Sequence, residues 1–287
     1  MKIYEYANQW LQDHNIMVRP TTAENYAYAI KRFQHFFEDQ ELSALSKSNV
    51  AETFRKMSAQ GLSRSSIYNV RQVFRAIYRS AQSQHLTDNN PFTNLPLPAD
   101  AQTKLVDAYS LEEMHKLIMA AAQDTMGDSF VFMMMTGLRL HEVINLKWED
   151  YNSERHTIYI RQSKTARGVA QIAISQLAEI ILQRQPIYEH GYVFSNLHKQ
   201  PLSKTSMRKL LYRLRNSSGI TDATNHRCRH TFCTLMIEAG ADAKTVSTLA
   251  RHSSVAFTMQ RYVTCNIDRQ RKELGLLDDI FNKMPPT

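Results

Sequence analysis

Apolar residues in positions 1–93 recur at intervals of three and four, the spacing of one buried helix face. Four such stretches follow one another, and Pro20 and Gly61 mark two of the breaks between them. Their apolar positions are Ile3, Tyr6, Ala7, Trp10 and Leu11; Tyr26, Ile30, Phe33 and Phe37; Val50, Phe54 and Met57; and Ile67, Val70, Phe74, Ile77, Tyr78 and Ala81. Amphipathic helices bury their apolar faces against one another, so this part is predicted to be a compact helical bundle.

Prolines interrupt the helical pattern after the fourth stretch. Pro91, Pro96 and Pro98 lie close together, and prolines at this density favour an extended connection. We therefore expect a linker over residues 94–107 and a second domain over residues 108–287.

The second domain mixes helical patterns with one region of period two. The run 130–135 is apolar on every side, as in a fully buried helix. Between 157 and 174, apolar and polar residues alternate on both sides of Gly168, which predicts a β-hairpin. The expected fold is mainly α-helical with a small β-hairpin or sheet, so the second domain is of the α+β class.

Composition narrows the class of protein only slightly. The 287 residues are 43% hydrophobic, enough for real cores, and 35 Lys and Arg against 27 Asp and Glu give a net charge of +8. This surplus suits a polyanionic partner without requiring one.

Cysteines and apolar runs indicate where the protein works. Three cysteines form no CxxC pair, and no apolar run resembles a membrane span or a signal-peptide core. A soluble intracellular protein is therefore expected.

Two predicted helices carry basic side chains along one face. Arg71, Arg75 and Arg79 recur at i, i+4 and i+8, and Arg208 and Arg213 lie on a later helix, with no acid on either helix to pair with them. Each face is either a solvated surface or a row of cations along a nucleic-acid backbone, and the sequence leaves both open. The candidate DNA-binding residues are Arg64, Arg71, Arg75, Arg79, Arg167, Arg208 and Arg213.

The densest chemistry lies in HRCRHTFCTLMIEAGADAKTVSTLARHSSVAFTMQRY, near the C-terminus. His226 and Arg229 share a helix face, and Tyr262 follows His252 by ten residues. Cations, imidazoles and a phenol together suggest a phosphate and a nucleophile. His226 and His230 also have the i,i+4 spacing of zinc ligands, but an HExxH glutamate is absent and arginines crowd the turn, so no metal site is expected.

Two further candidate cations lie upstream. Arg139 comes just after Gly137, at the start of a predicted helix, and Glu142 could hold its guanidinium or stabilise the first helical turn. An exposed arginine with an i,i+3 ion pair is the alternative. Lys164 and Arg167 lie in or beside the hairpin turn, as solvated cations or as groups delivered to a DNA groove.

Five separated motifs resemble those of the tyrosine recombinase (phage integrase) family. They are TGLRLHEVINLKWED, the hairpin Lys164, HRCRHTF, the segment 249–262, and GLSRSSIYNVRQVFRAIYRSA followed by NNPF. The resemblance covers most of the chain in family order. It implies an N-terminal SAM-like core-binding domain and a C-terminal tyrosine recombinase catalytic domain.

The sequence departs from the family pattern in three places. Arg251 stands where glycine is usual, and ten residues separate the last histidine and tyrosine where many members have nine. Arg227 and Cys228 stand where an acid and an apolar residue are common. These changes affect backbone geometry and neighbouring charge more than the reacting groups.

The resemblance also assigns the catalytic roles. Arg139 and Arg229 would hold the phosphodiester oxygens, which suits guanidinium geometry. Tyr262 would attack phosphorus to give a 3′-phosphotyrosyl bond, with His226 as base and Lys164 protonating the departing 5′-oxygen. The full catalytic set is Arg139, Lys164, His226, Arg229, His252 and Tyr262, with Glu142 and His230 in support.

The implied protein is a site-specific recombinase or integrase of a mobile genetic element, acting as a homotetramer on double-stranded DNA core sites. It would need no metal, ATP or other cofactor. Accessory DNA-bending proteins are further candidate partners, and the expected location is the cytoplasm, in association with the nucleoid. The apolar tail over residues 266–287 would dock into a neighbouring protomer or pack on its own core.

Two alternatives stay open. One is a type IB topoisomerase-like strand transferase that acts as a monomer, and the other is a DNA-binding protein with weak catalysis. The sequence fixes neither the DNA target nor the choice among integration, excision and resolution.

Overall fold

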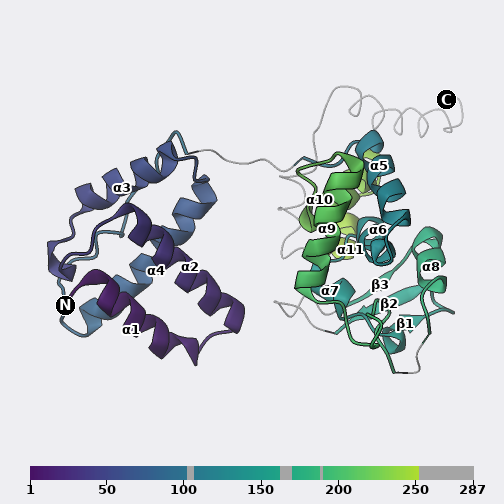
Figure 1. The fold of residues 1–287 in the computed structure, drawn as a ribbon, viewed down its shortest axis with the longest axis horizontal. Helices are drawn as coiled ribbons and strands as arrows, with labels where there is room; N and C mark the ends of the chain where they lie inside the picture. The colour runs from purple at the N-terminus through teal and green to yellow at the C-terminus, as the bar shows by residue number, and fades with distance from the viewer. Residues whose placement is uncertain (102–106, 162–169, 188–189, 252–287) are drawn as a thin grey trace, which may run out of the picture. The chain divides into compact units, whose positions relative to one another are not determined.

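The computed structural model places two compact units, Met1–Leu105 and Val106–Thr287, each with its own hydrophobic core. The residues it describes, coloured in Figure 1, are 1–101, 107–161, 170–187 and 190–251. Among these residues, no helix is both long and apolar enough to cross a lipid bilayer.

The first unit is a helical bundle, as its apolar stripes predict (Figure 1). Phe33 and Phe74 meet with ring centroids 4.4 Å apart, and Phe92, from the segment after the last helix, packs against both. The elements are α1 (Ile3–Asn15), α2 (Pro20–Phe36), the 3-10 helix η1 (Leu42–Ala44), α3 (Lys47–Ala59) and α4 (Arg64–Ser83).

The proline-rich stretch after α4 packs against this bundle. Arg71 Nη1 donates to the carbonyl of Leu95 at 2.5 Å, and Arg64 Nη1 donates to the carbonyl of Pro98 at 2.8 Å. Leu95 and Ala101 are buried in the core of the first unit. Two of the arginines on α4 therefore anchor the backbone of this stretch.

The second unit consists of a group of helices with a three-stranded antiparallel sheet at one end (Figure 1). Its elements are α5 (Leu111–Ala122), α6 (Gly127–Thr136), α7 (Leu140–Ile144), the 3-10 helix η2 (Trp148–Asp150), β1 (Tyr151–Asn152), β2 (Thr157–Ile160), β3 (Ala170–Ala173), α8 (Gln176–Gln183), α9 (Lys204–Ser218), α10 (Asn225–Glu238) and α11 (Ala243–Ala250). The strands lie in the order β1-β2-β3, and Ile158 of β2 is paired with Ile172 of β3. The mainly α fold with a small sheet is confirmed.

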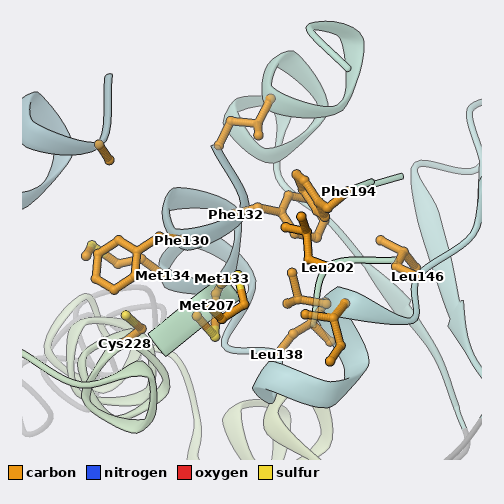
Figure 2. Close-up of a cluster of buried hydrophobic side chains, with 14 of the residues drawn as sticks. Phe130, Phe132, Met133, Met134, Leu138, Leu146, Phe194, Leu202, Met207 and Cys228 are labelled. Atoms are coloured by element: carbon orange, nitrogen blue, oxygen red, sulfur yellow. The ribbon is translucent and has the colours of Figure 1, made fainter. Parts of the chain in front are cut away.

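Helix α6 lies at the centre of the second core (Figure 2). Phe130, Phe132 and Met133 are fully buried, and α6 packs against α5, α8 and α10. Later elements complete the cluster with Phe194, Leu202, Met207 and Cys228. Because α6 is covered on several sides, its residues 130–135 are apolar all round, as the sequence predicted. It ends at Gly137, whose left-handed φ of 65° turns the chain immediately before Arg139.

Candidate active site

Arg139 occupies the N-cap position of α7, where Glu142 holds it. The Glu142 carboxylate accepts from the Arg139 backbone N–H at 2.7 Å and from Nη1 at 3.1 Å. The Glu142 side chain is 0% exposed, whereas that of Arg139 is 35% exposed. The buried Glu142 carboxylate thus orients Arg139, and part of the Arg139 side chain stays exposed to solvent.

Arg229 lies on α10 and is almost fully buried. Its Nη1 donates to the carbonyl of Gly137 at 2.9 Å, and its Nη2 donates to the carbonyl of Ala250. Burial lowers the pKa of Arg229 below its usual value, and the neighbouring Arg139 charge adds to this effect. Arg229 therefore connects the ends of α6 and α11 and is fixed close to Arg139.

Arg251 is the C-cap of α11 and adopts a left-handed conformation, with φ 52° and ψ 50°. Such a conformation costs a non-glycine residue about 1–2 kcal/mol. The side chain is 1% exposed, with Nη2 donating to Glu142 and Nη1 donating to the carbonyl of Leu249 at 3.0 Å. The Arg251 carbonyl accepts from Arg139 Nη2 at 3.3 Å. The residue that departs from the family pattern is thus part of the site.

Three guanidinium groups and one buried carboxylate make up this cluster of Arg139, Glu142, Arg229 and Arg251. Glu142 accepts from Arg139 and Arg251, while Arg229 donates to neighbouring backbone carbonyls. Positive charge exceeds negative charge there. Burial lowers the pKa of Arg251, while Glu142 opposes that shift. Such a preorganised cationic cluster is suited to an anion with several oxygens, such as a phosphodiester.

His226 lies one turn before Arg229 on the same helix, α10. Thr224 caps this helix by accepting from the Arg227 N–H at 3.0 Å, which fixes where the first turn begins. His226 is exposed, while His230 is buried with its Nδ1 3.2 Å from Thr234 Oγ1. The helix thus presents an imidazole at the surface beside the buried arginine.

Arg227 has a structural role on this helix. It donates to Glu113 at 2.9 Å, to Asp222 at 2.8 Å and to the carbonyl of Asp107 at 2.9 Å, and it lies over the Tyr109 ring at 4.3 Å. These contacts hold the beginning of the second unit against α10. A positive charge at this position therefore stabilises the helix that carries His226 and Arg229.

The remaining catalytic candidates, Lys164, His252 and Tyr262, lie outside the described residues, as does Arg167. The strands β2 and β3 flank the segment that carries Lys164 and Arg167 in sequence, and α11 ends two residues before His252. The structure brings together Arg139, Glu142 and Arg229, and it places His226 on the helix of Arg229. The tail over residues 266–287 is likewise not described.

The candidate DNA-binding arginines fall into two groups. Arg64 and Arg71 donate to backbone carbonyls of their own unit, and Arg213 forms a two-point ion pair with Asp124, at 2.6 and 3.0 Å. That acid comes from the segment between α5 and α6, 89 positions away, so the sequence of α9 alone could not reveal it. The exposed members of the set are Arg79, Arg208 and Arg213, of which Arg213 is held by its ion pair with Asp124.

Sequence reasoning missed the role of Arg251. It recorded the residue only as a replacement for glycine, and its partner Glu142 lies 109 positions away. No local pattern connects the two. An arginine at a position that demands positive φ was the one available signal.

Comparison with known proteins identifies the family of the chain. The family model described as "Phage integrase family" matches residues 104–269, and that of the "Phage integrase SAM-like domain" matches residues 2–97. Tyrosine recombinase XerC of Staphylococcus haemolyticus is 25% identical over 265 residues, covering 88% of each chain. Tyrosine recombinase XerD of Listeria monocytogenes is 24% identical over 277 residues, covering 88% of this chain and 92% of the relative.

Solved structures share the fold. The Tn1549 transposon integrase, in complex with circular intermediate DNA, superposes with a TM-score of 0.78 at 20% identity, covering 96% of this chain and 99% of that one. A lambda integrase, in a tetramer bound to a Holliday junction, gives a TM-score of 0.74 at 19% identity, covering 92% of this chain and 78% of that one. The resemblance seen in the sequence is confirmed, and the chain belongs to the phage integrase family.

Proposed function

We propose that this tyrosine recombinase cleaves and rejoins DNA strands at specific sites through a covalent 3′-phosphotyrosyl intermediate. The observation that carries the proposal is the cluster in which Arg139, held by the buried Glu142, lies close to Arg229, with His226 on the helix of Arg229. Membership of the phage integrase family supports it. The topoisomerase-like and catalytically weak alternatives are not favoured, because the relatives that match along the chain are tyrosine recombinases.

In this mechanism the arginines bind the scissile phosphate. Attack on a phosphodiester increases the negative charge on its non-bridging oxygens, and Arg139 and Arg229 stabilise that charge because they are already fixed in place. Arg139 is the more exposed of the two, so it reaches the phosphate from the solvent side.

The covalent step uses residues assigned from the sequence motifs. The phenol oxygen of Tyr262 bonds to phosphorus while the bond to the 5′-oxygen breaks, and His226 takes the phenol proton. Lys164 protonates the departing 5′-oxygen, and His252 hydrogen-bonds the phosphate. A 5′-hydroxyl of another strand then reverses the step. The phosphotyrosyl bond conserves the energy for rejoining, so ATP is not required.

We further propose residues 1–93 as a core-binding domain and residues 108–287 as the catalytic domain of an enzyme of a mobile genetic element. Four copies would act on two double-stranded DNA core sites, with residues 266–287 contacting a neighbouring protomer. A lambda integrase, a structural neighbour, is recorded as a tetramer on a Holliday junction, which supports this assembly. The enzyme would work in the cytoplasm at the nucleoid, with or without accessory DNA-bending proteins.

The test is covalent capture on nicked suicide duplexes, from which the 5′-hydroxyl strand is lost after cleavage. Duplexes with a randomised core are incubated with the protein, and covalent complexes are selected and sequenced to find the site. The wild-type protein is expected to form the adduct, and Tyr262→Phe is expected to form none. Adduct formation by Tyr262→Phe would show that the nucleophile is wrong. Full-rate relaxation of supercoiled DNA by the monomer would favour the topoisomerase reading.

A further inference from the structure

Arg251 contacts the Arg139–Glu142 pair with both its backbone and its side chain. Its carbonyl accepts from Arg139 Nη2 at 3.3 Å, and its own Nη2 donates to Glu142 Oε2. Given the proposed function, on which this inference rests, we propose that Arg251 is a positioning residue for strand cleavage. It neutralises Glu142, so that the charge of Arg139 stays available to the scissile phosphate.

The sharing of the Glu142 carboxylate carries the argument. Oε1 accepts from Arg139 Nη1, and Oε2 accepts from the Arg139 backbone N–H and from Arg251. The carboxylate is 0% exposed, so bulk solvent does not stabilise its charge. Without Arg251, Arg139 would be its only cationic partner among the described residues. The pair would then be nearly neutral, and the phosphate would meet less positive charge.

The turn at the end of α11 also positions both catalytic arginines through its backbone. Two successive carbonyls point into the cluster: that of Ala250 accepts from Arg229 Nη2, and that of Arg251 accepts from Arg139 Nη2. The left-handed φ of 52° at Arg251 produces this arrangement. The ion pair with Glu142 keeps the Arg251 side chain inside the cluster despite the strained backbone at Arg251.

The left-handed backbone provides a clean substitution. Glycine adopts this φ without strain, so Arg251→Gly keeps the turn and both carbonyls while it removes the guanidinium. Arg251→Lys retains a charge but loses the planar fork. Glu142→Gln removes the charge that Arg251 is proposed to neutralise, and it keeps the size of the side chain.

The experiment measures single-turnover formation of the covalent complex, with full-length protein in excess over a nicked suicide duplex carrying the site captured by the wild type. DNA affinity is measured in parallel by fluorescence anisotropy, and folding by thermal denaturation. Arg251→Gly is expected to slow cleavage by about tenfold or more, with DNA affinity changed by no more than about twofold. Arg251→Lys is expected to recover part of the rate.

Combining Arg251→Gly with Glu142→Gln tests whether Arg251 acts by neutralising the Glu142 carboxylate. In a Glu142→Gln background, Arg251→Gly is expected to change the rate by less than about twofold, because no carboxylate charge is left to neutralise. The inference is overturned if Arg251→Gly cleaves at the wild-type rate, or if it loses the same factor with and without the Glu142 carboxylate. Absence of any adduct from the wild type would instead refute the proposed function, which separates the two failures.

Discussion

At the scale of single residues, four consecutive side chains of α10 serve different parts of the protein. His226 is exposed, Arg227 is buried against the start of the second unit, Cys228 enters the hydrophobic core and Arg229 joins the arginine cluster. Burial raises the pKa of the Cys228 thiol, so this cysteine is a small core residue rather than a nucleophile. A single helical turn therefore fixes the candidate base and a candidate phosphate-binding arginine to the core.

Gly137, two residues before Arg139, combines a left-handed backbone with close packing. Its φ is 65°, and a Cβ added there would lie 2.4 Å from Phe232 Cδ1 on α10. We expect Gly137→Ala to destabilise the protein by about 2–4 kcal/mol, through a left-handed backbone and overpacking together. Urea unfolding followed by circular dichroism measures this loss.

Gly219 is the matched control for that substitution. Its φ is 76°, but a Cβ there meets nothing within 4 Å, so Gly219→Ala should cost only the backbone strain, about 1–2 kcal/mol. Equal losses for Gly137→Ala and Gly219→Ala would show that contact with Phe232 is unimportant. A larger loss for Gly137→Ala would establish that α10 and the turn before Arg139 are packed as one piece.

At the scale of elements, the ion pair between Asp124 and Arg213 fastens the segment after α5 to α9. The hydrogen bonds from Arg213 lower the pKa of Asp124 below its usual value. A carboxyl group with a lowered folded-state pKa stabilises the protein above its unfolded pKa of about 3.9, and this stabilisation is lost as pH falls through the folded value.

We therefore expect Asp124→Asn to lower the free energy of unfolding by about 1 kcal/mol near neutral pH, since Arg213 is 48% exposed and water screens the pair. The difference from wild type should shrink as the pH falls below about 4. Urea unfolding curves of both proteins across this range provide the measurement. A difference that stays constant with pH would mean that the charge of Asp124 contributes nothing.

Elements with strong periodicity were predictable from the sequence, and contacts between distant elements were not. The apolar run of α6 and the alternation in β2 and β3 each determine which side chains are buried, because burial follows the period of the backbone. Strand β1 has only two residues, too few to show alternation. The sequence therefore indicated a hairpin where the structure has three strands.

The site also combines residues that local patterns predict with contacts between distant elements that they do not. Arg139 follows a glycine turn, and His226 and Arg229 share one helix face, so local rules could place each of them. The contacts of Glu142 with Arg251 and of Arg213 with Asp124 span 109 and 89 positions. Such pairs depend on how helices pack, and one sequence holds no local signal for that.

At the scale of the whole molecule, the net charge of +8 favours binding to DNA, but only exposed cations can neutralise phosphates. Helix α4 offers a matched pair two turns apart. Arg79 is exposed, whereas Arg71 donates to the carbonyl of Leu95 and lies over the Tyr68 ring at 5.1 Å. The two arginines carry the same charge and differ in what they already contact.

We expect the DNA affinity of the wild type to fall linearly with the logarithm of salt concentration, with a slope of about −0.9 per neutralised phosphate. Arg79→Ala should reduce the magnitude of that slope by about 0.9, because an exposed arginine on α4 can contact a phosphate of the DNA backbone. Arg71→Ala should leave the slope unchanged and instead lower the stability of the first unit, since it removes the anchor of Leu95. Anisotropy titrations over a sodium chloride series measure both slopes. If the two substitutions reduce the slope equally, Arg71 leaves its carbonyl partner to bind DNA, and α4 presents the full row of arginines to the duplex.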